Sequence, residues 1–174
     1  MGQENFQVDV RVKGFVPHIR QKGYTCWAAA AAMMHSWRNQ QTFSIAQAID
    51  FAGEPYKERL KRGRTLRYEE NEAFAASMGM KCTGNRSFGF MEFCNLMTLR
   101  CSPLMVCILQ VNADMAHFNV ATRLYVSEEE MQMVVVNDSN REDRDIEKFF
   151  DDFAIEIEKA AAGSTRLEAQ ILHY

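Results

Sequence analysis

The sequence predicts an α+β domain in which helices and an antiparallel sheet form separate parts of the fold. The chain has 174 residues, close to the usual size of one domain. Up to about residue 100 the apolar residues follow helical spacing, whereas three strand-like runs come after residue 103. Helices followed by a run of strands are typical of α+β proteins. We expect a single domain over residues 1–174, with a core at about 15–160 and a C-terminal tail at 163–174.

The N-terminal part begins with a short strand and continues as helices. Residues 6–12 alternate apolar and polar side chains, as a half-buried strand does. Residues 26–38 are rich in alanine, which favours helix and allows close neighbours on several sides, so this helix should be central and buried. Ser44 is a suitable N-cap for the next helix. Further helices are predicted at residues 45–51, 67–78 and 88–99.

The C-terminal part changes to strand periodicity. Strands are predicted at residues 103–109, 118–126 and 131–136, and the short polar loops between them predict an antiparallel meander. Residues 146–162 carry apolar side chains at helical spacing and end before Gly163, which predicts a last helix.

The composition indicates a folded protein with no general affinity for polyanions. Hydrophobic residues make up 47% of the chain, charged residues 25%, and the net charge is −3. These values exclude a disordered chain and make nucleic acid an unexpected partner. The longest apolar stretch, residues 26–34, is about half the length that crosses a bilayer, so no membrane span is expected.

The N-terminus and the cysteines indicate where the protein acts. The first residues contain no apolar signal region. The five cysteines are an odd number without a C-x-x-C pair, which predicts free thiols and no metal site. We expect a cytoplasmic protein, or one exported by a system without a cleaved signal peptide.

Cys26 is the first candidate for a catalytic residue. It stands at the start of the predicted buried helix, where unpaired backbone N–H groups and the helix dipole favour a thiolate. A thiolate is a strong nucleophile. Gln21 precedes it by five residues, and its side-chain amide could join the Cys26 backbone N–H in an oxyanion hole.

His117 and Asp138 are the candidates for the base and its orienting acid. His117 opens one predicted strand and Asp138 follows the next, so a hairpin places them side by side. Asn137 or Asn140 is an alternative orienting residue. His18 lies on the same loop as Gln21 and is expected to be a surface histidine or to line the cleft.

These residues, in this order, resemble the active site of papain-like cysteine proteases. The segment from Gln21 through Cys26-Trp27 to Met33 is most similar to the compact bacterial branch, the C39-like and AvrRpt2-type peptidases. Ser139 stands where relatives often have proline, and Gly23 where larger relatives have a structural cysteine.

The resemblance implies a papain-like fold in which a helical half carrying Cys26 packs on a sheet carrying His117 and Asp138. It implies Cys26 as nucleophile, His117 as general base and acid, Asp138 as orienting residue and Gln21 as oxyanion donor. Trp27 and Gly23 are expected to contribute to substrate binding.

The expected function is cleavage of a protein or peptide substrate without a metal or other cofactor, by an effector or toxin that an inhibitor or immunity protein could control. An amidase, deamidase or transglutaminase-like acyl transferase would use the same residues, and an inactive binding module would keep only the fold. Residues 57–67 form the one strongly basic run, either a solvated face or an attractant for an acidic substrate or partner.

Overall fold

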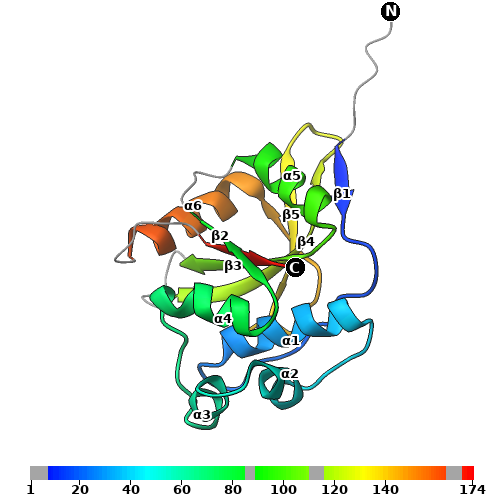
Figure 1. The fold of residues 1–174 in the computed structure, drawn as a ribbon. Coiled ribbons are helices and arrows are strands. Elements are labelled where there is room, and N and C mark those ends of the chain that lie inside the picture. The colour runs from blue at the N-terminus through cyan, green and yellow to red at the C-terminus, as the bar shows by residue number, and fades with distance from the viewer. Residues whose placement is uncertain (1–7, 85–88, 110–115, 164–169) are drawn as a thin grey trace, which may run out of the picture.

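A single antiparallel sheet separates two groups of helices in the computed structural model, which describes residues 8–84, 89–109, 116–163 and 170–174 (Figure 1). The strands are β1 (Asp9–Arg11), β2 (Lys81–Thr83), β3 (Leu104–Leu109), β4 (Ala116–Val126), β5 (Gln132–Asp138), β6 (Ile146–Phe149) and β7 (Ile171–His173). The helices are α1 (Cys26–Asn39), α2 (Ile45–Ala52), α3 (Tyr56–Lys61), α4 (Asn71–Ser77), α5 (Phe90–Arg100) and α6 (Phe150–Ala162), with a 3₁₀ turn at Tyr68–Glu70. The sheet order is β2-β7-β3-β4-β5-β6, and β1 pairs with β4.

Helix α1 is the central helix that the sequence predicts. Every residue from Cys26 to Trp37 is buried. The short alanine side chains let α2 and the sheet approach it closely, while the ring of Trp27 packs edge-on against Phe74 of α4, with ring centroids 5.2 Å apart. The first turn of α1 is therefore fixed from several sides.

The predicted meander of β3, β4 and β5 is confirmed. In the register of β4 and β5, Asn119 lies opposite Asp138, and the pairing is interrupted by an irregularity between Ala121 and Arg123. His117 is the second residue of β4, so this register brings it near the end of β5.

Two hydrophobic cores lie on the two sides of the sheet. The first joins α1, α2 and α4 to the sheet through residues such as Met33, Phe74 and Met105. The second joins α5 and α6 to the sheet through Phe93, Phe153 and other apolar side chains. The helical half expected from the sequence is the first of these layers, and α5 and α6 add a second layer (Figure 1).

Four segments differ from the sequence prediction, and one of them is strand β2, which was not predicted. Residues 146–149, predicted as the start of a helix, form β6, because their backbone pairs with β5 and the helix begins only at Phe150. The expected C-terminal tail contains β7, which pairs with both β2 and β3. Within the basic run lies α3, a helix that was not predicted.

The other predicted elements are confirmed with shifted ends. Ser44 caps α2 in a capping box with Gln47. The N-terminal strand is confirmed at Asp9–Arg11, while residues 6 and 7 lie outside the described residues. Among the described helices, none is both long and apolar enough to span a membrane.

Candidate active site

Cys26 is the first residue of α1 and is almost fully buried, with 8% of its surface exposed. The N–H groups in the first turn of a helix have no partner within the helix, and the first turn of α1 contains no acidic side chain. The positive end of the α1 dipole therefore lies at the residue that carries this sulfur.

His117 and Asp138 form a short hydrogen bond inside the protein. Nε2 of His117 donates to Oδ1 of Asp138 over 2.6 Å, and both side chains are buried. The same carboxylate oxygen accepts the backbone N–H of Asn140 at 2.8 Å. Two donors thus hold the carboxylate in place, and the carboxylate holds the imidazole ring.

The His117 ring also interacts with the side chain of Cys26, and this interaction raises the pKa of the ring. Because Nε2 is bonded to Asp138, Nδ1 is the nitrogen that remains for the sulfur. The structure therefore brings Cys26, His117 and Asp138 together, and the histidine interacts with both of the other side chains.

The electrostatics of this group favour a protonated histidine. Burial by itself lowers the pKa of His117, but the hydrogen bond to Asp138 and the contact with Cys26 outweigh it and raise the pKa to about 9. Burial raises the pKa of Asp138, yet the bond from His117 outweighs it and keeps this pKa below its ordinary value. Both shifts favour an imidazolium beside a carboxylate.

Gln21 is held in one orientation by two partners. Its Nε2 donates to the carbonyl oxygen of Gly23 at 2.8 Å, and its Oε1 accepts from the hydroxyl of Ser139 at 2.8 Å. A carbonyl oxygen can only accept, so the Gly23 contact identifies the amide nitrogen, and the Ser139 hydroxyl must then donate. One N–H of the amide is left after the bond to Gly23.

The loop before Cys26 is fastened to the end of β5. The backbone N–H of Gln21 donates to the carbonyl oxygen of Ser139 at 3.0 Å, and Nε2 of His18 lies 2.9 Å from the carbonyl oxygen of Asp138. His18 is thus partly buried in a structural contact. Gly23 permits the turn into α1, because its φ of 62° is a left-handed conformation that glycine adopts without strain.

A small pocket of about 20 Å³ opens beside Cys26. Trp27 forms part of the pocket wall, although its side chain is otherwise fully buried. Cys107 lines it too, but burial, together with charge on Cys26, raises the pKa of the Cys107 thiol. Cys107 therefore stays protonated, and Cys26 is the better nucleophile of the two.

Asp138, rather than the side chain of a neighbouring asparagine, forms the hydrogen bond to the His117 ring. The side-chain oxygen of Asn137 accepts the backbone N–H of Asp145 at 3.0 Å, and Asn140 reaches the site through its backbone. Sequence reasoning missed the contacts of Ser139 and His18. The one feature of the sequence that could have indicated the Ser139 contact is its hydroxyl group, at a position where relatives often have proline.

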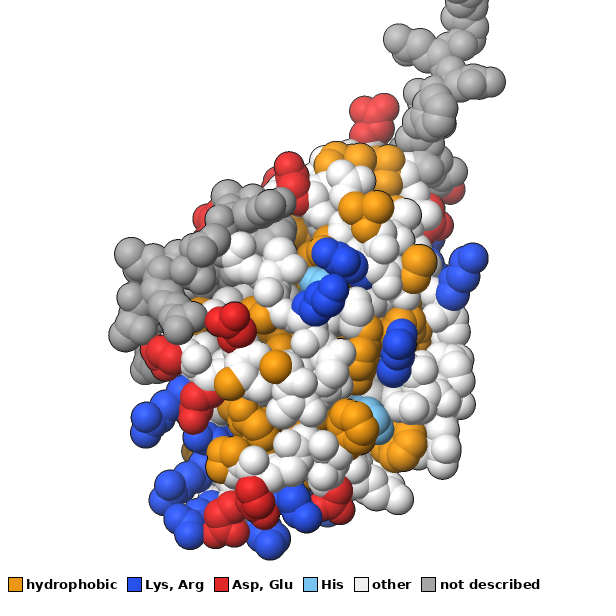
Figure 2. Space-filling model, viewed as in Figure 1, with side chains coloured by type: hydrophobic (Ala, Val, Ile, Leu, Met, Phe, Trp, Pro, Cys, Tyr) orange, Lys and Arg blue, Asp and Glu red, His pale blue; other side chains and the backbone are white. Residues whose placement is uncertain are grey.

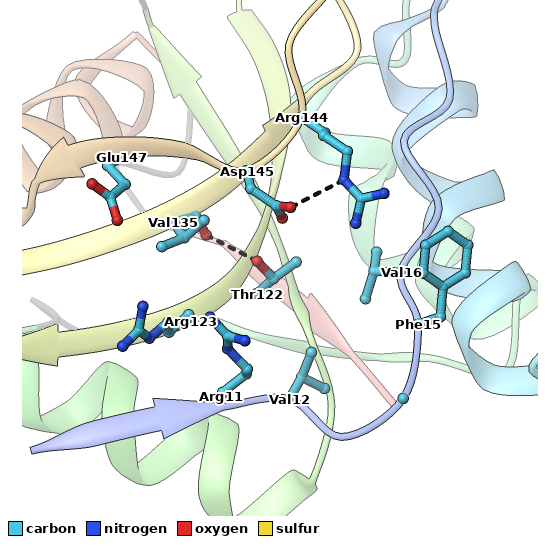
Figure 3. A pocket seen from close by; sticks show the side chains of 11 residues that line it. Arg11, Val12, Phe15, Val16, Thr122, Arg123, Val135, Arg144, Asp145 and Glu147 are labelled. Carbon is cyan, nitrogen blue, oxygen red and sulfur yellow. Dashed lines mark hydrogen bonds and ion pairs between the residues drawn. The ribbon is translucent and has the colours of Figure 1, made fainter.

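A larger cavity of about 220 Å³ lies elsewhere, between the loop after β1 and strands β4 to β6 (Figure 3). Its described lining contains no cysteine or histidine. Most of its charges are compensated: Arg123 pairs with Asp9, and Arg144 with Asp145. The described lining of this larger cavity therefore offers no thiol or imidazole for nucleophilic catalysis, whereas the small pocket contains Cys26. In the part of the chain that the structure describes, no group of three potential metal ligands is present.

Comparisons with known proteins bear on the fold and the family of the chain. No curated protein matches the chain. The fold is similar to that of UfSP from C. elegans, with a TM-score of 0.55 and 11% sequence identity over 96% of this chain. The chain spans about a third of that protein, 34% of its length, and at this identity the likeness concerns the fold alone.

A family model described as "Papain-like cysteine protease AvrRpt2" matches residues 5–154, most of the chain. Both the match and the fold agree with the resemblance seen in the sequence around Cys26, and the chain belongs to this family of papain-like cysteine peptidases.

Proposed function

We propose that the protein hydrolyses peptide bonds through Cys26, His117 and Asp138, with Gln21 as an oxyanion donor. The observation that carries this proposal is the position of His117, which hydrogen-bonds Asp138 and also interacts with the side chain of Cys26. A nucleophile, a base and an orienting acid in this arrangement can perform acyl transfer.

In the first half of the reaction the Cys26 thiolate attacks the carbonyl carbon of the scissile bond. The developing oxyanion accepts from the Cys26 backbone N–H and from the free amide N–H of Gln21. The His117 imidazolium then gives its proton to the leaving amine, which departs and leaves a thioester on Cys26.

In the second half His117, now neutral, takes a proton from water. The hydroxide attacks the thioester carbonyl, the tetrahedral intermediate collapses, and the thiolate and imidazolium are restored. Asp138 keeps the ring oriented and stabilises its positive charge throughout. Trp27 and Gly23 contribute to substrate binding as the wall of the small pocket and the turn before the nucleophile.

The test compares the wild type with Cys26→Ala on a mixture of denatured proteins, with products identified by mass spectrometry. We expect new peptide termini with the wild type and none with Cys26→Ala. Equal product spectra would contradict the proposal. A gain of one dalton at glutamine, or an amine adduct, would instead identify a deamidase or an acyl transferase on the same residues.

We propose further that residues 1–174 act as one domain and that the protein is an effector or toxin controlled by an inhibitor or immunity protein. The support is the resemblance to AvrRpt2-type peptidases. Expression of the wild type should then slow the growth of a target cell, whereas Cys26→Ala should not. Equal growth of the two strains in every host tested would contradict a toxic role.

A further inference from the structure

The basic run at residues 57–67 reaches the candidate active site. Thr65 and Leu66 line the same small pocket as Cys26. The indole N–H of Trp27, the residue after the nucleophile, donates to the carbonyl oxygen of Arg64 at 3.0 Å. The backbone of this run therefore forms part of the wall beside Cys26.

The run is held firmly at this place. Nη1 of Arg59 donates to the carbonyl oxygen of Thr65 at 2.6 Å, and its Nη2 forms an ion pair with Glu70. The backbone N–H of Arg64 donates to the carbonyl oxygen of Arg59 at 3.1 Å. Side chains that branch from residues 61 to 67 thus start from a fixed backbone.

The cations of the run fall into two groups. Lys57, Arg59 and Arg62 form ion pairs with Asp50, Glu70 and Glu58, respectively. The second group consists of exposed cations that form no ion pair with any residue that the structure describes. Its members are Lys61, Arg64 and Arg67. Figure 2 shows Lys and Arg side chains, interspersed with acidic ones, gathered at the end of the molecule where α3 lies.

We propose that Lys61, Arg64 and Arg67 bind acidic side chains of the peptide substrate close to the scissile bond. The proposal rests on the proposed function and specifies its substrate class. The whole chain carries a net charge of −3, so an acidic peptide is repelled on average. The three cations belong to the run whose Thr65 and Leu66 line the pocket of Cys26, so they make the potential near the pocket more positive and select for Asp and Glu in the bound peptide.

The first test uses Cys26 itself as the probe and needs no substrate. Iodoacetate is an anion and iodoacetamide is neutral, so the ratio of their alkylation rates reports the local potential at the sulfur. Arg64→Glu and Arg67→Glu should each lower this ratio about two- to fivefold at low ionic strength, with a smaller effect in high salt. Arg64→Glu keeps the backbone carbonyl that holds Trp27.

Arg100→Glu is the matched control, because Arg100 is exposed at the end of α5, in the helical layer that packs against the second core. The control changes the net charge equally and should leave the ratio unchanged. The same ratio in Arg64→Glu, Arg67→Glu and Arg100→Glu would overturn the proposal. A thiol in the wild type that reacts with iodoacetamide no faster than a model thiol would instead count against the proposed function, and the comparison of ratios would still decide the present proposal.

The second test reads the substrate directly. A peptide library made from a digested proteome is incubated with each variant, and the residues around every cleaved bond are counted. Asp and Glu should be enriched at one or more positions near the bond for the wild type and for Arg100→Glu. The enrichment of Asp and Glu should be lost in the double variant that combines Arg64→Glu and Arg67→Glu. Cleavage by the wild type without any acidic enrichment would overturn the inference while leaving the peptidase intact.

Discussion

The hydroxyl of Ser139 donates to Oε1 of Gln21 over 2.8 Å and so joins the strand that carries Asp138 to the loop that leads to Cys26. A second bond, from the backbone N–H of Gln21 to the carbonyl oxygen of Ser139, runs in the opposite direction. Two hydrogen bonds therefore link the segments of Asp138 and Gln21, the residues proposed as orienting acid and oxyanion donor, although these segments lie more than a hundred residues apart.

Ser139→Ala should lower kcat for peptide hydrolysis about five- to tenfold, because loss of one hydrogen bond lets the Gln21 amide rotate. KM should change little. Alkylation of Cys26 by iodoacetamide forms no oxyanion, so its rate should stay at the wild-type value. Ser139→Thr keeps the hydroxyl and should restore most of kcat. A loss of alkylation in Ser139→Ala parallel to the loss of kcat would show a general disturbance of the site instead.

Gln21→Ala should lower kcat more strongly, by about 10²–10³-fold, which is the usual effect of removing one oxyanion donor. The measurement is steady-state hydrolysis of a peptide that the wild type cleaves, with thiol alkylation as the second readout. If Gln21→Ala retained full kcat, the oxyanion would have to be stabilised by backbone N–H groups alone, and the role proposed for Gln21 would be wrong.

The sequence pointed to Cys26 and His117 as candidate nucleophile and base for reasons that are local. A cysteine at a helix start and a histidine at a strand start can each be recognised from a few neighbouring residues in the sequence. The meander of β3 to β5 follows from the short loops between these strands. The pairing of His117 with Asp138 then follows from hairpin geometry alone.

Contacts between distant segments were not predictable in this way. Strand β7 is only Ile171–His173 and becomes a strand by pairing with β2 and β3, far earlier in the chain. The first residues of the predicted last helix pair with β5 for the same reason. Likewise, the Ser139 hydroxyl meets Gln21 only once the sheet has formed, so no periodicity in either segment reveals it.

Asp138→Asn should shift the alkaline limb of the pH profile of kcat/KM toward lower pH. The Asp138 carboxylate helps to raise the pKa of His117 to about 9, and the leaving amine needs the protonated ring. Removing the negative charge lowers this pKa, so activity should decline at a lower pH than in the wild type. The maximal rate should fall as well, because the ring is less well oriented.

The matched control is Asp143→Asn, which makes the same chemical change at an exposed position in the loop after β5. Its pH profile should coincide with that of the wild type. An alkaline limb that stays in place in Asp138→Asn would mean that His117 is not the group that titrates there.

Ala31→Leu should destabilise the folded protein by about 1–3 kcal/mol, because Ala31 is fully buried in α1 and a larger side chain has no space there. Ala46→Leu makes the same change on an exposed position of α2 and should alter the free energy of unfolding by less than about 0.5 kcal/mol. Urea unfolding at pH 7 measures both. Since α1 carries Cys26 at its first residue, crowding at Ala31 should also slow alkylation of the thiol in the folded state. Equal stability of the two variants would show that the alanines of α1 do not set the close packing around the helix.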